Sequence, residues 1–349
     1  MSRYNVEGFT DRELDYYSRQ IVLRDMGLKA QRKLKKSTVT LVGVGGLGSP
    51  IAMQLASMGV GCLRLIDYDV VEISNLQRQH LFGVDQIGLP KVEAATHRVS
   101  KLNPFIEIQP IPMAVTPMNA SDLIKGSDVV IGALDAMSPR YSINRACLDH
   151  EIPFIHGGAL EYNGNISTII PGKTACLECF HGGVKDEDLP TCATVGVHPS
   201  VLSITSSIMS SETVRILTEQ TPLLTDKLMF IDLQNLSFET ITLKRSESCS
   251  VCGKTKQAPP IHYENVTEIC GREGYRVFIF TADKDHRLNL ADVTKTITSL
   301  GFDIKVEGKL GISFIKGTVK GSIMSSGVTI LEGLPELNSA MKLQQTFFQ

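Results

Sequence analysis

The sequence contains no apolar run near the roughly 20 residues that a membrane-spanning helix needs. It also has no excess of charge of one sign, because 35 Lys and Arg residues stand against 37 Asp and Glu residues. A chain without a basic field offers nucleic acid no general attraction. We therefore expect neither a membrane span nor direct binding of nucleic acid.

The beginning of the chain lacks the basic segment and the apolar core of a secretory signal peptide. The 349 residues nevertheless include 8 cysteines. Without a secretion signal, cysteines indicate metal or thiol chemistry rather than disulfides, and they favour a reducing compartment. We expect a cytoplasmic protein whose length allows one large core or two domains.

Residues 9–36 predict an amphipathic helical segment, in which Thr10 and Glu13 have the spacing of a capping box. Arg19 lies in this segment. From spacing alone, Arg19 is more typical of a solvated or paired surface side chain than of a site residue.

A glycine-rich turn follows the first β-branched, apolar run, residues 38–42. This order predicts a buried strand, a tight turn and a helix. Its glycines permit positive φ and bring backbone N–H groups close to a phosphate, as in the G-x-G-x-x-G pattern. Alone, the pattern fits a nucleotide site or an ordinary strand–helix turn. The glycines are Gly43, Gly45, Gly46 and Gly48.

Asp67 follows the next predicted strand, residues 62–66. It stands about twenty residues after the last loop glycine, where a βαβ nucleotide-binding fold places a carboxylate on the ribose. An aspartate at this point can also cap a helix or stabilise a turn. The spacing favours the nucleotide site.

Two basic side chains follow. Lys91 stands at the beginning of a predicted helix, where positive charge opposes the helix dipole unless an anion lies nearby. Arg78, in a polar loop, offers a planar guanidinium that suits phosphate oxygens. For Lys91 the alternative is a surface charge, and phosphate binding is favoured.

Strands that alternate with helices predict a doubly wound, mostly parallel α/β sheet of the Rossmann type. Ligands of such sheets bind off the carboxyl ends of the strands, where the glycine loop, Asp67 and Asp135 fall. An aspartate there can be a buried cap, and beside phosphates it is a natural Mg²⁺ ligand. Several cations around a leaving group suit ATP with departing pyrophosphate better than hydride transfer. Further strands are expected at 105–110, 127–134, 153–156, 163–170, 228–233 and 239–243, with a helix over 200–217.

Two C-x-x-C pairs give the strongest metal pattern of the chain. Four thiolates close a tetrahedral Zn²⁺ site and leave no open position for catalysis, so we expect a structural zinc. The alternative is four buried or redox-active cysteines. The pairs are Cys176 with Cys179 and Cys249 with Cys252.

Cys192 stands outside both pairs, in a segment with Pro, Thr and Gly that predicts a surface loop. This position suits a reactive thiol, although many loop cysteines are inert.

Residues 1–255 would form the first domain and residues 256–270 a linker that contains Pro259 and Pro260. Residues 271–349 predict a small α+β domain without a visible catalytic constellation.

Taken together, these motifs resemble the HesA/MoeB/ThiF branch of the ubiquitin-activating enzymes. The resemblance covers roughly residues 9–255. It rests on the glycine loop, on the paired C-x-x-C motifs, and on residues 17–20, 67–69, 74–79, 88–91, 102–104, Asp135, Arg140 and Asn144.

The resemblance implies ATP-dependent adenylation of the C-terminal glycine of a small β-grasp protein, a ubiquitin-like or sulfur-carrier protein ending in Gly-Gly. It also implies zinc at the four cysteines, Mg²⁺ at Asp135, and a homodimer in which Arg19 reaches the neighbouring subunit's ATP. The implied ATP ligands are Gly46, Asp67, Ser74, Asn75, Leu76, Gln77, Arg78, Lys91, Asp135 and Ala136. Gly43, Gly45, Gly48 and Asp69 complete the expected nucleotide site.

The chain departs from the family pattern in three places. Tyr16 stands before Tyr17 where the family often has Arg, although Arg19 and Gln20 are kept. Ala136 stands where Asn is common, and the C-terminal domain resembles neither a rhodanese domain nor the ubiquitin-fold domain of conjugation-type activators. Cys192 resembles the family's active-site thiol, which would attack the acyl adenylate to give a thioester or a persulfide-derived linkage. Adenylation of an RNA-borne or small carboxylate, and a non-catalytic scaffold that holds a modifier, are the alternative functions.

Overall fold

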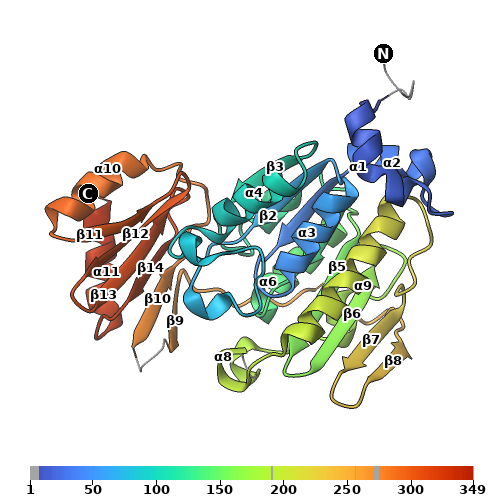
Figure 1. Ribbon diagram of the computed structural model, residues 1–349. Helices are drawn as coiled ribbons and strands as arrows, with labels where there is room; N and C mark the ends of the chain where they lie inside the picture. The colour runs from blue at the N-terminus through green and yellow to red at the C-terminus, as the bar shows by residue number, and fades with distance from the viewer. Residues whose placement is uncertain (1–7, 190–191, 256, 271–274, 349) are drawn as a thin grey trace.

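The computed structural model describes residues 8–189, 192–255, 257–270 and 275–348, which fold around two sheets (Figure 1). The strands of the first sheet lie in the spatial order β3 (Glu107–Ile111), β2 (Cys62–Ile66), β1 (Thr38–Val42), β4 (Val129–Gly132), β5 (Phe154–Leu160), β6 (Asn163–Ile169), β7 (Lys227–Asp232) and β8 (Ser237–Thr242). The strands from β3 to β5 pair in parallel, and β6, β7 and β8 continue the sheet antiparallel. The expected mostly parallel, doubly wound sheet is confirmed.

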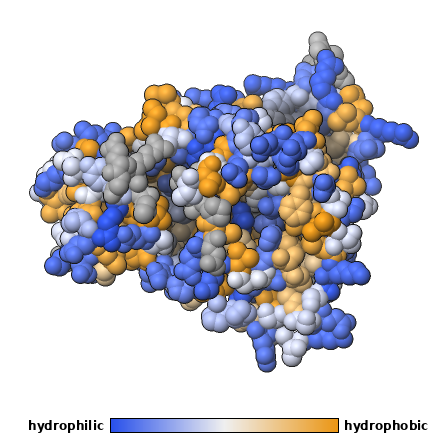
Figure 2. All heavy atoms as spheres, turned by 90° about the horizontal axis from the view of Figure 1, so that it is seen from below, coloured by the Kyte–Doolittle hydropathy of each residue, from blue (hydrophilic) through white to orange (hydrophobic). Residues whose placement is uncertain are grey.

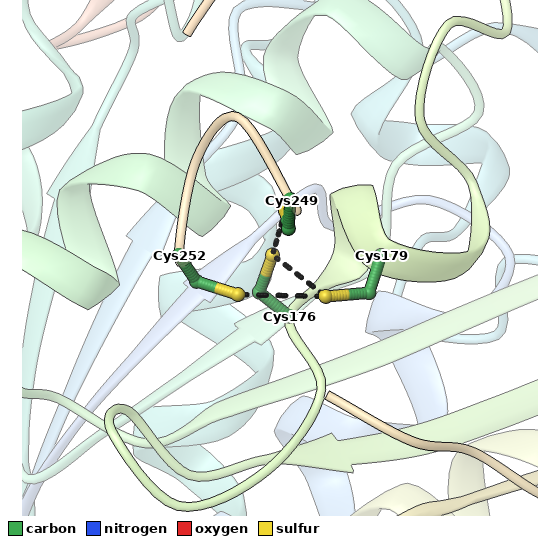
Figure 3. Close-up of side chains that lie close together, drawn as sticks. All are labelled: Cys176, Cys179, Cys249 and Cys252. Carbon is green, nitrogen blue, oxygen red and sulfur yellow. Dashed lines mark hydrogen bonds between the residues drawn. The ribbon is translucent and has the colours of Figure 1, made fainter. Parts of the chain in front are cut away.

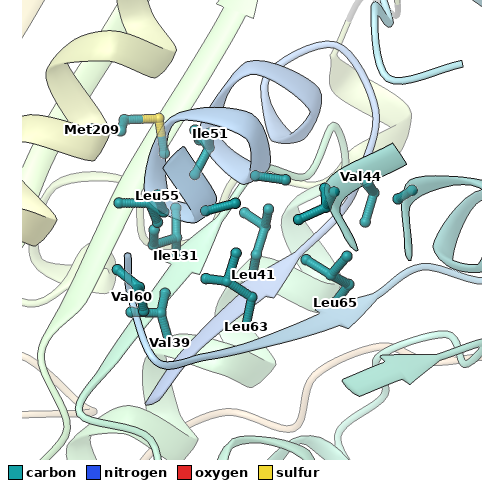
Figure 4. Close-up of a cluster of buried hydrophobic side chains, with 14 of the residues drawn as sticks. Val39, Leu41, Val44, Ile51, Leu55, Val60, Leu63, Leu65, Ile131 and Met209 are labelled. Carbon is teal, nitrogen blue, oxygen red and sulfur yellow. The ribbon is translucent and has the colours of Figure 1, made fainter. Parts of the chain in front are cut away.

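Helices cover both faces of this sheet because its central strands are apolar on both faces. In β1, Val39 and Leu41 face one layer, and Val42 belongs to the core on the other face. Figure 4 shows the first core, where Ile51 and Leu55 pack against Leu41 and its neighbours. The first layer includes α3 (Gly48–Met58), α4 (Lys91–Leu102) and α9 (Pro199–Leu217), and the second includes α5 (Ala120–Ile124) and α6 (Met137–Asp149).

The beginning of the chain forms two helices, α1 (Asp11–Ile21) and α2 (Gly27–Lys36), where the sequence predicts one helical segment. The chain turns between them, and Gly27 has the left-handed φ of 62° that a continuous helix excludes. The predicted capping box of α1 is confirmed, since Thr10 and Glu13 each accept a hydrogen bond from the other's backbone N–H.

The second sheet has the order β11 (Asp303–Glu307), β12 (Gly311–Lys316), β13 (Val319–Met324), β14 (Thr329–Glu332), β10 (Arg276–Phe280) and β9 (Val266–Cys270). Its neighbouring strands pair antiparallel, and α10 (Leu290–Ser299) and α11 (Leu337–Phe347) pack on one face around Phe278 and Phe314. This confirms the expected α+β character. Strand β9 lies inside the segment predicted as a linker, and the exact division into domains stays a prediction.

The remaining helical turns are short. They are α7 (Leu177–Phe180), α8 (Cys192–Val195), η1 (Ile73–Asn75), η2 (Val84–Gln86) and η3 (Asp186–Asp188). Among the described residues, none of the helices has both the length and the apolar content to cross a bilayer. The face shown in Figure 2 carries polar and apolar side chains in mixture.

Candidate active site and metal centre

The glycine loop connects β1 to α3 in a conformation that only glycine permits at two positions. Gly43 has a φ of 89°, and a Cβ there would lie 2.4 Å from the Ala133 carbonyl oxygen. A Cβ at Gly48 would lie 2.0 Å from the Gly43 carbonyl oxygen. Both contacts are closer than real Cβ atoms approach, so the loop packs tightly against the end of β4 and against itself.

The middle of the loop is less tightly packed at Gly45, whereas a Cβ at Gly46 would lie 2.8 Å from Cδ1 of Leu202. Gly45 and Gly46 are half-buried, whereas the loop residues on either side are buried. A Cβ at Gly45 would meet only the Gln79 amide nitrogen, at an ordinary 3.6 Å. The loop therefore keeps backbone within reach of a ligand at its centre, the place where a phosphate binds in loops of this type.

Asp67 fixes the loop to the end of β2. Its carboxylate accepts hydrogen bonds from the backbone N–H of Val44 at 2.8 Å and of Asp69 at 2.9 Å. Burial raises the pKa of Asp67, and the positive charge of Lys91 offsets part of this rise. The carboxylate thus lies beside the glycine loop, as the sequence spacing predicts.

Lys91 points back toward the same strand ends from the first turn of α4. Its Nζ lies 2.5 Å from Oδ2 of Asp69, and its backbone N–H donates to the Asp69 carbonyl at 2.8 Å. Burial lowers the pKa of Lys91, but the charges of Asp69, Asp67 and Asp135 outweigh burial and raise it. The lysine is therefore a fixed cation among three carboxylates. Asp69 supplies a negative charge near the helix beginning in place of the expected phosphate, so phosphate binding by Lys91 stays a prediction.

Residues 72–79 form a compact loop beside this cluster. Asn75 is buried, and its Oδ1 accepts a hydrogen bond from Glu72 N–H at 3.1 Å. Arg78 donates from Nη1 to the Ser74 carbonyl at 2.8 Å, which fixes its half-buried side chain. Ser74 and Leu76 are half-buried, whereas Gln77 is exposed.

Gln79 is a candidate that the expected site omits. Its side chain is 4% exposed, it lies next to Gly45, and its Oε1 has no partner among the described residues. A buried amide oxygen without a partner is costly, so a ligand at the glycine loop would satisfy it. A glutamine in a polar loop carries no local sign of this burial, which explains why sequence reasoning omits it.

Asp135 follows β4 and is exposed, and Ala136 is the residue before the first turn of α6. The first backbone N–H groups of α6 are capped by a side chain that is distant in sequence. Asp186 accepts hydrogen bonds from Met137 N–H and from Ser138 N–H, the latter at 3.1 Å. The acidic loop between the cysteine pair and Cys192 is thereby tied beside Asp135, a contact absent from the sequence expectations.

Arg19 lies away from this cluster. The neighbouring Gln20 donates to the carbonyl of Met58, the last residue of α3. The glycine loop precedes the other end of α3, an 11-residue helix that is about 16 Å long. Arg19 is exposed and does not join the cluster of Lys91 within one chain.

Cys192 begins α8, and its side chain lies outside the described residues.

The four paired cysteines come together as the spacing predicts (Figure 3). Their sulfur atoms lie within 4.8 Å of one another, with Cys176 at 3.8 Å from both Cys179 and Cys249. Four thiolates bound tetrahedrally at a Zn–S distance of about 2.3 Å would lie about 3.8 Å apart. Burial raises the pKa of Cys176, and the nearby cysteines raise it further, so a bound cation would relieve the cost of four thiolates. The donor set fits a closed metal centre.

A doubly wound sheet with a glycine loop, a carboxylate pair and a buried lysine at its strand ends defines a nucleotide-binding protein of the Rossmann class. A family model described as the ThiF family matches residues 17–251, well over half of the chain. The chain belongs to the ThiF family, in the ThiF/MoeB branch of the E1-like superfamily. The resemblance read from the motifs is confirmed.

Named relatives agree with this assignment. The chain is 37% identical over 243 residues to the SAMP-activating enzyme E1 of Haloferax volcanii, across 69% of this chain and 90% of that protein. It is 34% identical over 251 residues to the sulfur carrier protein ThiS adenylyltransferase of Escherichia coli, across 71% and 99%. With the adenylyltransferase and sulfurtransferase MOCS3 of Aedes aegypti, it shares 31% identity over 296 residues, 84% of this chain and 65% of that protein.

Among solved structures, E. coli MccB with MccA-N7isoASN matches with a TM-score of 0.62 and 25% identity. The match covers 69% of this chain and 75% of that chain. The family model ends at residue 251, so the second sheet lies beyond it.

Proposed function

We propose that this protein is an adenylyltransferase that uses ATP to activate the C-terminal glycine of a small ubiquitin-like or sulfur-carrier protein ending in Gly-Gly. The observation that carries the proposal is the position of Lys91 between Asp69 and Asp67 beside the glycine loop. The relatives named as activating enzymes or adenylyltransferases support the reaction class and the kind of partner.

The residues of the site fit ATP. The half-buried backbone at Gly45 and Gly46 would accept phosphates, and Asp67 would bind the ribose. Lys91 and Arg78 would neutralise the negative charge that grows on the departing pyrophosphate. Asp135 would hold Mg²⁺, which supplies further neutralisation of the triphosphate.

The reaction needs no general base, because a terminal carboxylate is ionised at neutral pH. One carboxylate oxygen attacks the α-phosphorus and forms a new P–O bond. The bond from the α-phosphorus to the bridging oxygen breaks, and pyrophosphate leaves with that electron pair. The chain's task is to hold both reactants and to stabilise the leaving charge.

The four cysteines would hold a structural Zn²⁺ that ties the end of the first domain to the segment after β6. Cys176 and Cys179 come before the loop of Asp186, and Cys249 and Cys252 follow β8. Among the described residues, 6 cysteines are free rather than disulfide-bonded: Cys62, Cys147, Cys176, Cys179, Cys249 and Cys252. This supports a reducing compartment such as the cytoplasm.

A homodimer would give Arg19 a role that it lacks within one chain. The side chain is exposed on α1, and a second copy would carry it to the neighbouring nucleotide. Mixing the Arg19→Ala and Asp135→Ala variants tests this arrangement. A heterodimer would contain one intact site, so activity would return to about a quarter of wild type if subunits exchange freely. Mixtures that stay inactive despite exchange would contradict the shared site.

Cys192 stays the proposed acceptor of the activated carboxylate. A Cys192 thiolate would displace AMP from the acyl adenylate and form a thioester. Intact-mass spectrometry after incubation with ATP and carrier protein would show a covalent adduct that Cys192→Ala lacks. An adduct that survives this substitution would assign the chemistry elsewhere.

ATP–pyrophosphate exchange tests the reaction class. Asp135→Ala is expected to abolish exchange, whereas Asp149→Ala is expected to preserve it, because Asp149 is exposed at the other end of α6. Exchange that needs an RNA or a small acid instead of a carrier protein would favour the other adenylation reactions. Carrier binding without exchange would favour the scaffold.

A further inference from the structure

A turn of the second sheet reaches into the first domain at the beginning of α4. The turn connects β11 to β12, and its Lys309 and Leu310 donate backbone N–H groups to the carboxylate of Glu93, each at 2.9 Å. Glu93 is 5% exposed, and Leu310 packs against the core of the first sheet. A buried carboxylate therefore binds a backbone turn that is more than two hundred positions away in sequence.

Glycines on both sides make this close contact possible. A Cβ at Gly308 would lie 2.6 Å from Glu93 Oε2, and one at Gly311 would lie 2.9 Å from Pro90 Cγ. In the first domain, a Cβ at Gly88 would lie 2.8 Å from a methyl carbon of Val306. The two surfaces thus approach so closely that a side chain at these glycines would clash. A loosely attached domain does not require such close packing.

The contact borders the ion pair of the nucleotide site. Glu93 stands two positions after Lys91 in the first turn of α4. On its other side, the segment before α4 is bonded to the extension of β2, since Val70 bridges to Pro90 and Lys91 N–H donates to Asp69. The backbone of Lys91 is therefore held between the end of β2 and the β11–β12 turn.

The second sheet also contacts the segment that carries Asp69, the ion-pair partner of Lys91. Tyr68, between Asp67 and Asp69, packs against the buried cluster of Ala282, Met324 and Val328. Ser313 adds a hydrogen bond from Oγ to the Gly88 carbonyl at 2.6 Å. The C-terminal domain thus contacts the segments that carry both members of the Asp69–Lys91 pair.

We propose that the C-terminal domain positions the nucleotide site, with Glu93 as the residue through which the β11–β12 turn fixes Lys91 for phosphate binding. The inference rests on the proposed function for the identity of the nucleotide. It assigns a role to the part of the chain that lies beyond the matched family segment. Glu93 and Ser313 act through Lys91 and are positioning residues.

The test compares two serines that make the same kind of contact between the domains. Ser313 donates to Gly88, next to α4, whereas Ser326 donates from Oγ to the Pro112 carbonyl at 2.5 Å, beyond the end of β3. Calorimetry with a non-hydrolysable ATP analogue gives the Kd of each full-length variant. Ser313→Ala should raise Kd about threefold, the value of one hydrogen bond, and Ser326→Ala should leave it within about twofold.

Glu93→Gln should raise the same Kd about tenfold and raise KM for ATP more than it lowers kcat. Gly308→Ala, which moves the turn away from Glu93, should have the same effect if Glu93→Gln does not fold. Glu93→Asp should recover part of the affinity. Thermal unfolding of each variant separates a positioning role from a loss of fold.

Two results would overturn the inference. One is equal loss of nucleotide affinity in Ser313→Ala and Ser326→Ala, and the other is a lowered Tm with unchanged Kd in Glu93→Gln or Gly308→Ala. A wild-type chain that binds no ATP analogue would instead overturn the proposed function. The two failures are therefore distinct.

Discussion

The Nζ atom of Lys91 lies 2.5 Å from Oδ2 of Asp69, and this ion pair joins the beginning of α4 to the end of β2. The lysine side chain is 7% exposed, whereas the aspartate is 39% exposed. Both charges lie next to Asp67, which is bonded to the glycine loop. A buried cation is thus held at the strand ends, with its partner open to solvent and to a ligand.

Replacing Lys91 with methionine should lower pyrophosphate exchange at least about 100-fold, because the site loses a fixed cation that stabilises the leaving group. Asp67 and Asp69 would also repel each other without the lysine, so the Tm should fall. Lys101→Met is the matched control, since Lys101 is exposed in the last turn of the same helix. Similar losses in both variants would contradict the assigned role.

Zinc should be present at about one ion per chain in the purified protein, measured by elemental analysis. Cys176→Ser should lower this content and the Tm, because three thiolates remain in a buried cluster. Cys147→Ala is the control, because Cys147 is buried in the second core and outside the cluster. Full zinc content in Cys176→Ser would disprove the four-cysteine site.

Stability should fall as the pH drops, and His156 should contribute to this fall. Burial, Arg140 and His181 lower the pKa of His156, while a 3.1 Å hydrogen bond with Asn165 opposes the shift. Below the ordinary histidine pKa of about 6.5, His156 binds a proton in the unfolded chain but stays neutral in the folded chain. The free energy of unfolding therefore rises with pH up to that value.

Urea titrations between pH 5 and 8 measure this contribution. His156→Gln should reduce the slope below pH 6.5 by up to about 1.4 kcal/mol per pH unit, the value for one proton. His97→Gln, at an exposed position of α4, should leave the slope unchanged. An unaltered slope in His156→Gln would show that the ring titrates normally in the folded chain.

The contact between Asp186 and α6 should be visible by hydrogen exchange. Asp186→Ala removes the acceptor of the Met137 and Ser138 N–H groups, so these amides should exchange faster and stability should fall by about 1 kcal/mol. Glu187→Ala is the neighbouring control, because its side chain is exposed beside Lys185. Unchanged protection in Asp186→Ala would mean that the cap does not persist in solution.

Sequence patterns predicted those features whose causes are local or periodic. The apolar run before Gly43 predicts β1. Parallel pairing then places Asp67, Lys91 and the glycine loop at the same edge of the sheet. The two sulfurs of each cysteine pair lie together because C-x-x-C spacing restricts each pair to one turn, and the preference of zinc for four thiolates predicts that the pairs meet. These predictions required no knowledge of side-chain packing.

The remaining features depend on contacts that leave no periodic pattern. In the sequence, Glu93 is typical of an acidic residue in a first helical turn. Its carboxylate nevertheless accepts hydrogen bonds from the backbone N–H groups of Lys309 and Leu310 in the second sheet. Strand β9 follows two prolines that favoured a linker, and its pairing with β10 decides its structure. Tertiary contacts, rather than propensity, determine both.

The most direct test of the central claim is pyrophosphate exchange with a β-grasp carrier protein from the same genome, compared with the same carrier lacking its terminal glycine. We expect exchange with the complete carrier and none with the shortened one, and we expect Asp135→Ala to be inactive with both. Absence of exchange with every such carrier, or exchange indifferent to the missing glycine, would contradict adenylation of a carrier terminus.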